Sequence, residues 1–489
     1  MNILFVSPQS PKTFWSFSYA LKFISKKANL PPLGLVTIAS MVPDTWNKKL
    51  IDMNTDKLKD KDILWADYVF ISAMIIQKDS TRQVIDKCSA LGVKTVGGGP
   101  LFTADHESYA DVDHLLLYEG ELALPKFLND LEHNCAQHLY DWIGWPDLST
   151  TPTPAWELLD VKKYAMLSIQ YSRGCPFHCE FCNVVSLFGH TPRTKSVEQL
   201  IDELERIYAT GWRGSIFFVD DNFIGNKTKL KKEVLPALID WMKERRYPYT
   251  FFTEVSINLA DDDELMELMI QAGFDTVFVG IETVSEESLA ECNKKQNANR
   301  DLTACVNKMQ QYGFQVQGGF ILGFDSDQPS IFERMTGFIQ NSGIVTAMVG
   351  MLNAPKGTAL YSRLEKEDRL VASFSGTNTD INFVPKMDIE TLTSGYQDVV
   401  ETIYAPRNYF ERVKTFLAKY KRPKHKKTRV RFGNVISFIK TNFWLGIFSK
   451  ERVYYWKLLF WSLFKRPDVF PMAITFSVYG YHFRRSLKL

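Results

Sequence analysis

The strongest constraint on the fold is the regular alternation of short apolar runs with amphipathic segments. In the first part of the chain the apolar runs, which we predict to be strands, are Ile3–Val6, Leu50–Asp52, Tyr68–Ala73, Val93–Gly97 and His114–Tyr118. Helical patterns lie between them, for example Ser80–Leu91, with Ser80 as its expected N-cap. This order favours an α/β fold with a doubly wound, flavodoxin-like parallel sheet, in which ligands bind at the carboxyl ends of the strands.

The same alternation resumes further along with a longer period. Six more strands are predicted at Ala165–Gln170, Ser215–Val219, Tyr249–Val255, Thr276–Ile281, Gln315–Leu322 and Val345–Leu352. Helices fall between them, and Val197–Ala209 is preceded by Ser196, which forms a capping box with Gln199. Six βα units predict a partial (βα)6 barrel, with its active site on the loops at the carboxyl ends of the strands.

A cluster of cysteines follows the first predicted barrel strand. Cys175, Cys179 and Cys182 form a C-x3-C-x2-C run within YSRGCPFHCEFCNV. Thiolates this close together can hold three irons of a four-iron cluster and leave the fourth iron open. Zinc is the main alternative, with His178 as a fourth ligand, but structural zinc sites usually pair two short spacings and no second pair follows.

Disulfide bonds are a further alternative for these cysteines. The chain has seven, at positions 88, 135, 175, 179, 182, 292 and 305, and its length does not call for covalent cross-links. The N-terminus has no basic segment and too short an apolar run for a signal peptide. We therefore expect a reduced metal site in a cytoplasmic protein.

The cysteine run resembles that of the radical SAM family, in which an aromatic residue such as Phe181 usually precedes the last cysteine. The resemblance implies a [4Fe–4S] cluster, whose open iron binds S-adenosylmethionine and cleaves it to a 5′-deoxyadenosyl radical. It also implies an electron donor such as flavodoxin or ferredoxin.

Polar residues and glycines follow the other predicted barrel strands. Any one of them could simply cap the next helix. By the same resemblance, however, we expect Glu254 to contact the ribose or amino group of S-adenosylmethionine, with Ser256 beside it. Glu282 and Gly323 are expected in the same pocket. Arg193 is expected to pair with a carboxylate or with cobalamin.

The first domain resembles the cobalamin-binding domains found before many radical SAM barrels. The residues that carry this likeness and that we expect at the cofactor are Ser72, Gly97, Gly98, Gly99 and Glu119. Ser7–Lys12 contains no histidine, so cobalamin would bind without a histidine ligand from this loop. The alternative is a flavodoxin-like scaffold whose glycines only form a tight turn.

The domain plan has five parts. We predict a cobalamin-binding-like domain at 1–135, a linker at 136–160, a barrel at 161–380, a helical cap at 381–420 and a basic aromatic tail at 421–489. Prolines in the linker argue against regular structure there. The cap resembles the C-terminal region of the subgroup that contains hopanoid methylases, through Tyr396, Tyr404, Pro406, Tyr409, Phe410 and Arg412.

The tail differs in charge from the rest of the chain. From Lys421 onward there are sixteen Lys and Arg against two Asp and Glu, although the formal net charge of the whole protein is only +2. Its first basic run could equally suit nucleic acid. The aromatic and aliphatic residues interleaved with Lys and Arg after it favour a helix in the headgroup region of a membrane, at the inner face. Packing of these aromatics on the barrel is the alternative, and we expect no nucleic-acid partner.

Three functions are compatible with these features. The leading hypothesis is a radical SAM C-methyltransferase that methylates an unactivated carbon of a lipid-like or natural-product small molecule, with cobalamin as methyl carrier. The second is radical coupling, cyclisation or rearrangement without cobalamin turnover. The third is a non-catalytic cobalamin or redox sensor, against which the cysteine run and the strand-end residues argue.

Overall fold

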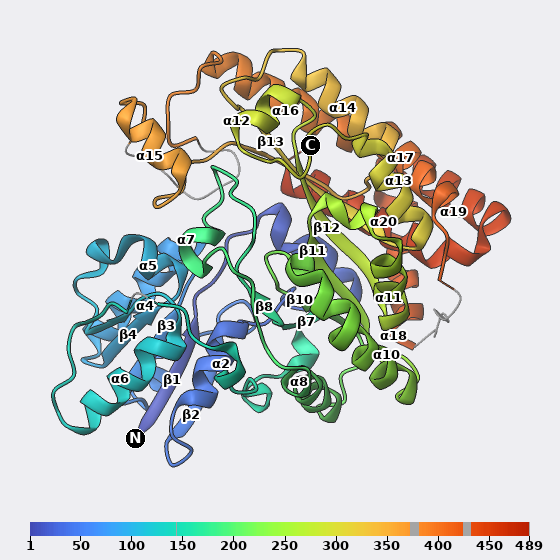
Figure 1. The fold of residues 1–489 in the computed structure, drawn as a ribbon. Helices are drawn as coiled ribbons and strands as arrows, with labels where there is room; N and C mark the ends of the chain where they lie inside the picture. Colours follow the sequence, from blue (N-terminus) through green and yellow to red (C-terminus); the bar gives the residue numbers. More distant parts are fainter. Residues whose placement is uncertain (143, 372–380, 424–431, 489) are drawn as a thin grey trace.

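The computed structural model describes residues 1–142, 144–371, 381–423 and 432–488, which form two six-stranded parallel sheets (Figure 1). The first sheet has the order β2-β1-β3-β4-β5-β6. Its strands are β1 (Asn2–Ser7), β2 (Asn47–Asp52), β3 (Tyr68–Ser72), β4 (Lys94–Gly98), β5 (His114–Leu116) and β6 (Leu139–Tyr140). The predicted doubly wound parallel sheet is confirmed.

Helices cover both faces of this sheet, because alternate side chains of a strand point to opposite sides. Ile3 and Phe5 of β1 pack in one core with α2 (Leu33–Met41) and α6 (Gly120–Glu132). Leu4 and Val6 pack in the other core with α4 (Lys78–Ala90) and α5 (Pro100–Asp105).

The predicted N-cap of α4 is wrong. A 3-10 turn at Ile75–Gln77 leads directly into the helix, which begins at Lys78 rather than after Ser80. The Ser80 hydroxyl instead accepts a hydrogen bond from the Gln9 N–H at 2.9 Å. A contact distant in sequence thus outweighs the local capping preference.

The linker is more regular than its prolines predict. Leu139–Tyr140 adds β6 to the edge of the first sheet, with Leu115 paired to Leu139. Short 3-10 turns follow at Leu148–Thr150 and Trp156–Leu158. The prolines fall between these pieces, where no ladder hydrogen bond is needed.

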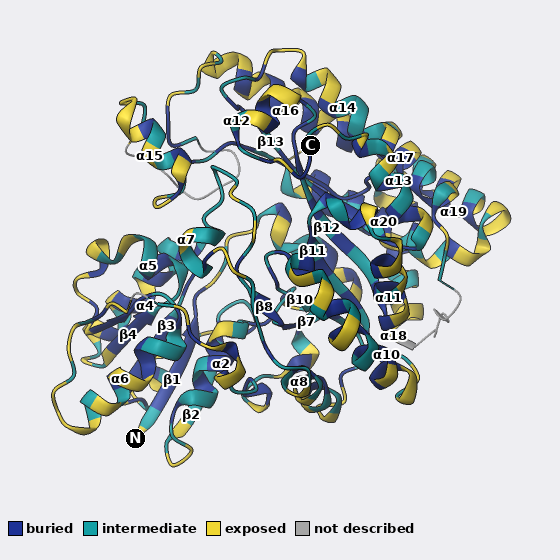
Figure 2. Cartoon of the chain, in the orientation of Figure 1, coloured by how far each residue is buried: buried dark blue, intermediate teal, exposed yellow. Residues whose placement is uncertain are grey.

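The second sheet is the predicted partial barrel, with the order β14-β13-β12-β11-β10-β7. Its strands are β7 (Met166–Ile169), β10 (Ser215–Phe218), β11 (Thr250–Val255), β12 (Phe274–Glu282), β13 (Gln315–Leu322) and β14 (Ala347–Met351). The outer helices include α8 (Val197–Ala209), α10 (Leu235–Glu244), α11 (Asp263–Ala272), α13 (Leu302–Tyr312) and α14 (Ile331–Ser342), whose buried faces line the sheet (Figure 2). The capping box of α8 is confirmed, since Ser196 Oγ accepts from the Gln199 N–H at 3.2 Å.

The C-terminal helices extend the outer layer beside α14. They include α16 (Ile389–Tyr404), α17 (Pro406–Lys419) and α20 (Phe470–Ser486). The Tyr404 hydroxyl donates to the Ala347 carbonyl of β14, and the Tyr409 hydroxyl donates to the Phe476 carbonyl, both at 2.7 Å. Tyr404 and Tyr409 of the predicted cap are therefore core residues in the outer layer of the barrel.

Candidate active site

The three cysteines lie on one loop closed by a small antiparallel hairpin, β8 (Ser172–Arg173) and β9 (Arg193–Thr194). Gly174 follows β8 with φ +95°, and a Cβ there would lie 2.9 Å from the Gly189 carbonyl oxygen, so the turn requires glycine. The Cys182 N–H donates to the Cys179 carbonyl at 3.1 Å. These backbone contacts fix the loop on which the three cysteines lie.

The surroundings of the thiols fit a metal cluster. Burial raises the pKa of Cys182 to about 12 and also raises the pKa of Cys175. The Gln296 side-chain amide donates to the Cys179 sulfur at 3.7 Å. Buried thiols ionise readily only beside positive charge, which bound iron would supply.

The zinc alternative gains no support from the structure. Among the described residues no three or more His, Cys, Asp or Glu side chains converge on a position for one metal ion. His178, the expected fourth zinc ligand, instead stacks on His190 with 3.5 Å between ring centroids.

Asp220, at the end of β10, anchors the base of the cysteine hairpin. Its carboxylate accepts from the Tyr171 N–H at 3.1 Å, and from both the N–H and the hydroxyl of Ser172. Burial raises the pKa of Asp220 to about 7 in spite of these donors. The role of Asp220 is thus to fix the strand that enters the cysteine loop.

Carboxyl groups from neighbouring strand ends meet beside the loop. Burial, and to a lesser extent the charges of Asp221, Asp220 and Glu282, raises the pKa of Glu254 to about 8. Asp221, whose pKa burial raises to about 6, has a buried Oδ2 without a hydrogen-bond partner among the described residues. A cationic ligand would relieve this crowding of negative charge. The cluster therefore fits the ammonium and sulfonium groups of S-adenosylmethionine.

Glu282 is held by a lysine that sequence reasoning missed. Its carboxylate pairs with Lys294 Nζ at 2.6 Å, and a Cβ on Gly280 would lie only 2.8 Å from that nitrogen. Glu282 itself has φ +62°, an uncommon backbone conformation for a non-glycine residue. Lys294 and Gln296 belong to the polar run after α12 (Glu286–Glu291), which in sequence looks like any solvated loop.

The other predicted pocket residues lie around the same loop. Gly323, with φ +103°, donates its N–H to Asp327 at 2.9 Å. Phe181 packs edge-on against Phe324 with ring centroids 6.1 Å apart. Ser256 donates its hydroxyl to Asn258 at 2.6 Å and lines a cavity of about 420 Å³ beside the cysteine loop. Their contacts with S-adenosylmethionine stay predictions.

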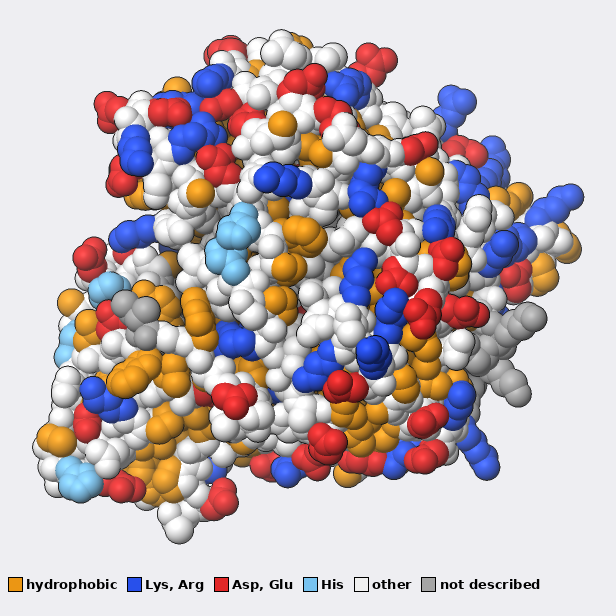
Figure 3. Space-filling view, in the orientation of Figure 1, with side chains coloured by type: hydrophobic (Ala, Val, Ile, Leu, Met, Phe, Trp, Pro, Cys, Tyr) orange, Lys and Arg blue, Asp and Glu red, His pale blue; other side chains and the backbone are white. Residues whose placement is uncertain are grey.

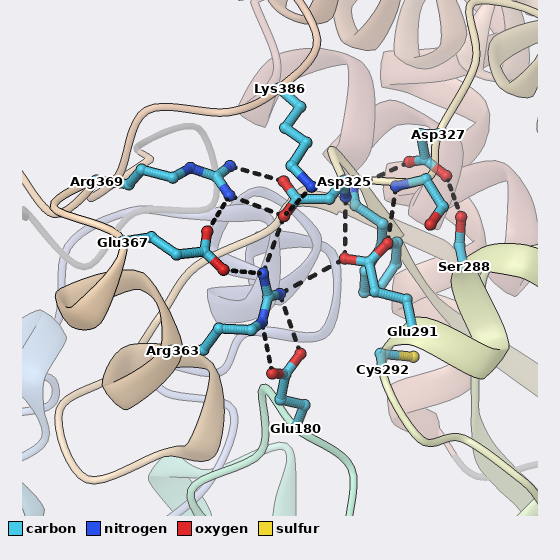
Figure 4. A network of polar contacts seen from close by, with 12 residues as sticks. Glu180, Ser288, Glu291, Cys292, Asp325, Asp327, Arg363, Glu367, Arg369 and Lys386 are labelled. Carbon is cyan, nitrogen blue, oxygen red and sulfur yellow. Dashed lines mark hydrogen bonds and ion pairs between the residues drawn. The ribbon is translucent and has the colours of Figure 1, made fainter.

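Glu180, between the second and third cysteines, is fixed by backbone and side chain (Figure 4). Its N–H donates to the Cys292 carbonyl at 3.0 Å, and its carbonyl accepts from the Leu360 N–H at 2.9 Å. Its carboxylate accepts two hydrogen bonds from Arg363, at 2.7 and 3.1 Å. The loop is thereby tied to α15 (Ala359–Lys366), an element beyond the last barrel strand.

Asp325, after β13, extends this network (Figure 4). It pairs with Arg363 at 2.9 Å and with Arg369 at 2.6 Å. Burial alone would raise the pKa of Asp325, but hydrogen bonds from the two arginines hold it at about 2. The network connects the cysteine loop, the Gly323 turn and α15 through salt bridges.

A second ion-pair cluster joins the cysteine hairpin to the first domain. Arg173 of β8 pairs with Glu121 at 2.7 Å, and Arg193 of β9 pairs with Glu119 at 2.6 Å. Arg173 also bonds Glu119, whose side chain is only 2% exposed. The expected pairing of Arg193 with a carboxylate is confirmed. The Glu119 carboxylate, predicted at the cobalamin, is engaged by both arginines, and its role toward that cofactor stays a prediction.

The remaining predicted cobalamin residues lie at the carboxyl edge of the first sheet. A Cβ on Gly97 would lie 2.9 Å from the Phe102 ring, and one on Gly98 would lie 3.3 Å from the Leu116 carbonyl. Gly99 has φ +90°, and its Cβ would lie 2.9 Å from the Ser72 hydroxyl. Packing thus accounts for all three glycines, while a contact of this edge with cobalamin stays a prediction.

Comparisons with known proteins place these features in a family. Residues 169–339 match the model of the radical SAM superfamily, and residues 358–489 match a domain of unknown function, DUF4070. The chain is 38% identical to an uncharacterized methyltransferase of Synechocystis sp., over 99% of this chain and 91% of the relative. It is 34% identical to the hopanoid C-2 methylase of Rhodopseudomonas palustris, over 84% of this chain and 78% of that enzyme.

A solved structure shares the architecture. The cobalamin-dependent S-adenosylmethionine radical enzyme OxsB, solved with aqua-cobalamin and S-adenosylmethionine, matches with a TM-score of 0.66 at 14% identity. The match covers 100% of this chain and 79% of OxsB.

The barrel, the cysteine loop and these matches define a radical SAM enzyme. The chain belongs to the family of radical SAM methyltransferases that includes hopanoid C-2 methylase. Membership implies S-adenosylmethionine, a [4Fe–4S] cluster and cobalamin as cofactors.

Proposed function

We propose that the protein transfers a methyl group to an unactivated carbon of a lipid-like or natural-product small molecule, with cobalamin as the methyl carrier. The observation that carries the proposal is the direct attachment of the cysteine hairpin to the first domain through Glu119, Arg173 and Arg193. It holds the expected cluster loop next to the domain expected to bind cobalamin. The relationship to hopanoid C-2 methylase supports the same reaction class.

We assign the following roles to the residues of this chain. When bound, the cofactors supply a hydrogen-abstracting 5′-deoxyadenosyl radical and a transferable methyl group. Cys175, Cys179 and Cys182 would hold the cluster. Asp221 and Glu254 would hold the cationic end of S-adenosylmethionine by charge-assisted hydrogen bonds.

An apolar substrate is supported by the inner face of the barrel. Phe218 and Phe251 belong to the core beneath the outer helices, so Phe217 and Phe252 point to the opposite, inner side. These two rings stack there with centroids 4.5 Å apart. Stacked aromatic rings favour a large apolar substrate over a charged one.

Two partners complete the proposal. An external donor such as flavodoxin or ferredoxin would supply the electron that a cluster held by the three cysteines needs. The protein reaches a lipid-like substrate from the inner face of a membrane, with the basic aromatic tail as the part of the chain that favours this location.

Anaerobic reconstitution with iron, sulfide and cobalamin tests the reaction. With methyl-deuterated S-adenosylmethionine, reduced flavodoxin as the electron donor and an apolar lipid extract, we expect both S-adenosylhomocysteine and 5′-deoxyadenosine, and a lipid that carries the labelled methyl group. Formation of 5′-deoxyadenosine alone would favour coupling, cyclisation or rearrangement, and formation of neither product would favour a sensor.

The cobalamin part has a separate spectroscopic test. Ser7–Lys12 offers no histidine, so bound cob(II)alamin should show no nitrogen splitting from a protein imidazole in its EPR spectrum. Such a splitting, or failure to retain any corrinoid, would contradict this part of the proposal.

A further inference from the structure

The segment from Val435 to Phe464 concentrates exposed apolar side chains. Twelve of the 22 exposed large apolar residues of the described chain lie in it. They belong to α18 (Phe432–Thr441), the π-helical turn η11 (Asn442–Phe448) and α19 (Arg452–Lys465). We call them the tail face: Val435, Ile436, Ile439, Phe443, Trp444, Ile447, Phe448, Val453, Trp456, Phe460, Leu463 and Phe464.

Helix α19 is apolar on two opposite sides. Its inner side buries Tyr455, Leu458 and Leu459 in the main core. Its outer side carries five residues of the tail face, and Phe464 there is 76% exposed. A surface helix normally turns its apolar side chains to the core and polar ones to solvent. Since the protein covers only one side of α19, the apolar side chains on its outer side would be buried only by another molecule or a membrane.

The parts of the tail face on η11 and on α19 adjoin each other. The Trp456 indole N–H donates to the Gly446 carbonyl at 3.0 Å, which joins α19 to η11. The Phe460 ring lies 5.7 Å from that of Trp456 and 6.5 Å from that of Phe464. A contiguous exposed patch of this kind marks an interaction surface.

Positive charge surrounds this surface. Lys450, Arg452, Lys457 and Lys465 are exposed and have no carboxylate partner in the part of the chain that the structure describes. Glu451, the only acidic residue between positions 435 and 465, pairs with Arg484 of α20 instead. Around α19, at the right of Figure 3, Lys and Arg side chains lie next to apolar ones.

We infer that the tail face inserts into the headgroup region of an anionic lipid leaflet. Its apolar side chains would enter the acyl boundary while the surrounding cations contact lipid phosphates. A nucleic acid would match the cations but leave the apolar side chains in water. In a second copy of this chain, the same cations would face each other. No described helix is long and apolar enough to cross a bilayer.

This inference rests on the proposed function only where it places the substrate in a membrane. The membrane contact can be measured without cofactors or turnover, so loss of methylation and loss of lipid binding are distinguishable results.

The test is flotation of the full-length protein with vesicles of phosphatidylcholine alone or mixed with phosphatidylglycerol. Wild-type protein should float with the anionic vesicles and less with the neutral ones, and salt should weaken binding. The variant F448Q/F460Q/F464Q should lose at least about tenfold in partitioning, because each Phe would otherwise bury its ring. K450Q/R452Q/K457Q should lose the preference for anionic vesicles.

A matched control separates this effect from a general loss of surface hydrophobicity. L64Q/V384Q/I389Q removes three exposed apolar side chains outside the tail face and should float like wild type. If wild type stays unbound at low salt, or if the Phe variant floats equally well, the inference is wrong. If wild type is a dimer that the Phe variant converts to monomer while neither floats, the tail face binds a second copy instead.

Discussion

Replacing Glu119 by Gln should release the cysteine hairpin from the first domain. The substitution keeps the size of the side chain but removes the charge that Arg173 and Arg193 share. The Arg173 and Arg193 side chains, 11% and 16% exposed, are then left with Glu121 as the remaining carboxylate of the cluster. Burial alone would raise the pKa of Glu121, but Arg173 holds it below its usual range, so Glu121 stays charged and keeps Arg173 partly compensated.

The magnitude follows from the burial of this cluster. Removing one partner of a buried ion pair costs about 3 to 5 kcal/mol, and we take about 3 because Glu121 remains. If that free energy favours opening of the hairpin, its amide protons should exchange roughly 150-fold faster, since about 1.4 kcal/mol is a factor of ten. The measurement is hydrogen exchange with mass spectrometry on peptides that cover positions 119–121 and 171–195, in protein without cofactors.

Glu107→Gln, an exposed substitution in the same domain, should leave this exchange unchanged. The argument would be refuted if E119Q exchanged within about twofold of wild type, because the ion pairs would then contribute well under 1 kcal/mol to closing the hairpin.

Three further predictions concern the site itself. Replacing Cys175, Cys179 and Cys182 by Ala should abolish iron–sulfur absorption and S-adenosylmethionine cleavage. The variants C88A and C305A should retain both. A reconstituted triple variant that still bound about four irons would contradict this prediction. Burial raises the pKa of Glu254 to about 8, so in the cofactor-free protein Glu254 stays neutral when folded but ionises when unfolded. The free energy of unfolding therefore decreases as the pH rises toward 8. In E254Q the melting temperature should therefore fall less steeply between about pH 5 and pH 8 than in wild type or in the exposed control E264Q, and parallel curves would exclude the effect. Arg363→Gln should destabilise the closed cysteine loop by about 2 kcal/mol, because it removes the charge-assisted hydrogen bonds of the partly exposed Arg363–Glu180 pair. The readout is faster hydrogen exchange of the amides around Glu180. The surface control R206Q should change nothing there, and equal exchange in R363Q would mean that the backbone contacts of Glu180 suffice.

The sequence by itself determined the order of the elements and the position of the cysteine run. The strands of both sheets, except β6 and the polar first half of β2, are apolar runs whose neighbours are helical patterns, and such periodicity is local. The capping box at Ser196 could be predicted because both its partners lie within four residues. The expected N-cap at Ser80 failed because a 3-10 turn already leads into the helix and because the Ser80 hydroxyl contacts Gln9, which is distant in sequence.

Only the tertiary structure decided which charges meet. Nothing near Glu119 in the chain predicts that it pairs with Arg173 and Arg193, and nothing near Glu282 predicts Lys294. The tertiary structure also divided the tail, whose α20 is largely buried while one side of α19 stays exposed. From composition alone α19 and α20 look alike, because both combine aromatic residues with Lys or Arg. Burial is fixed by the surfaces that other elements offer, and those surfaces exist only once the chain has folded.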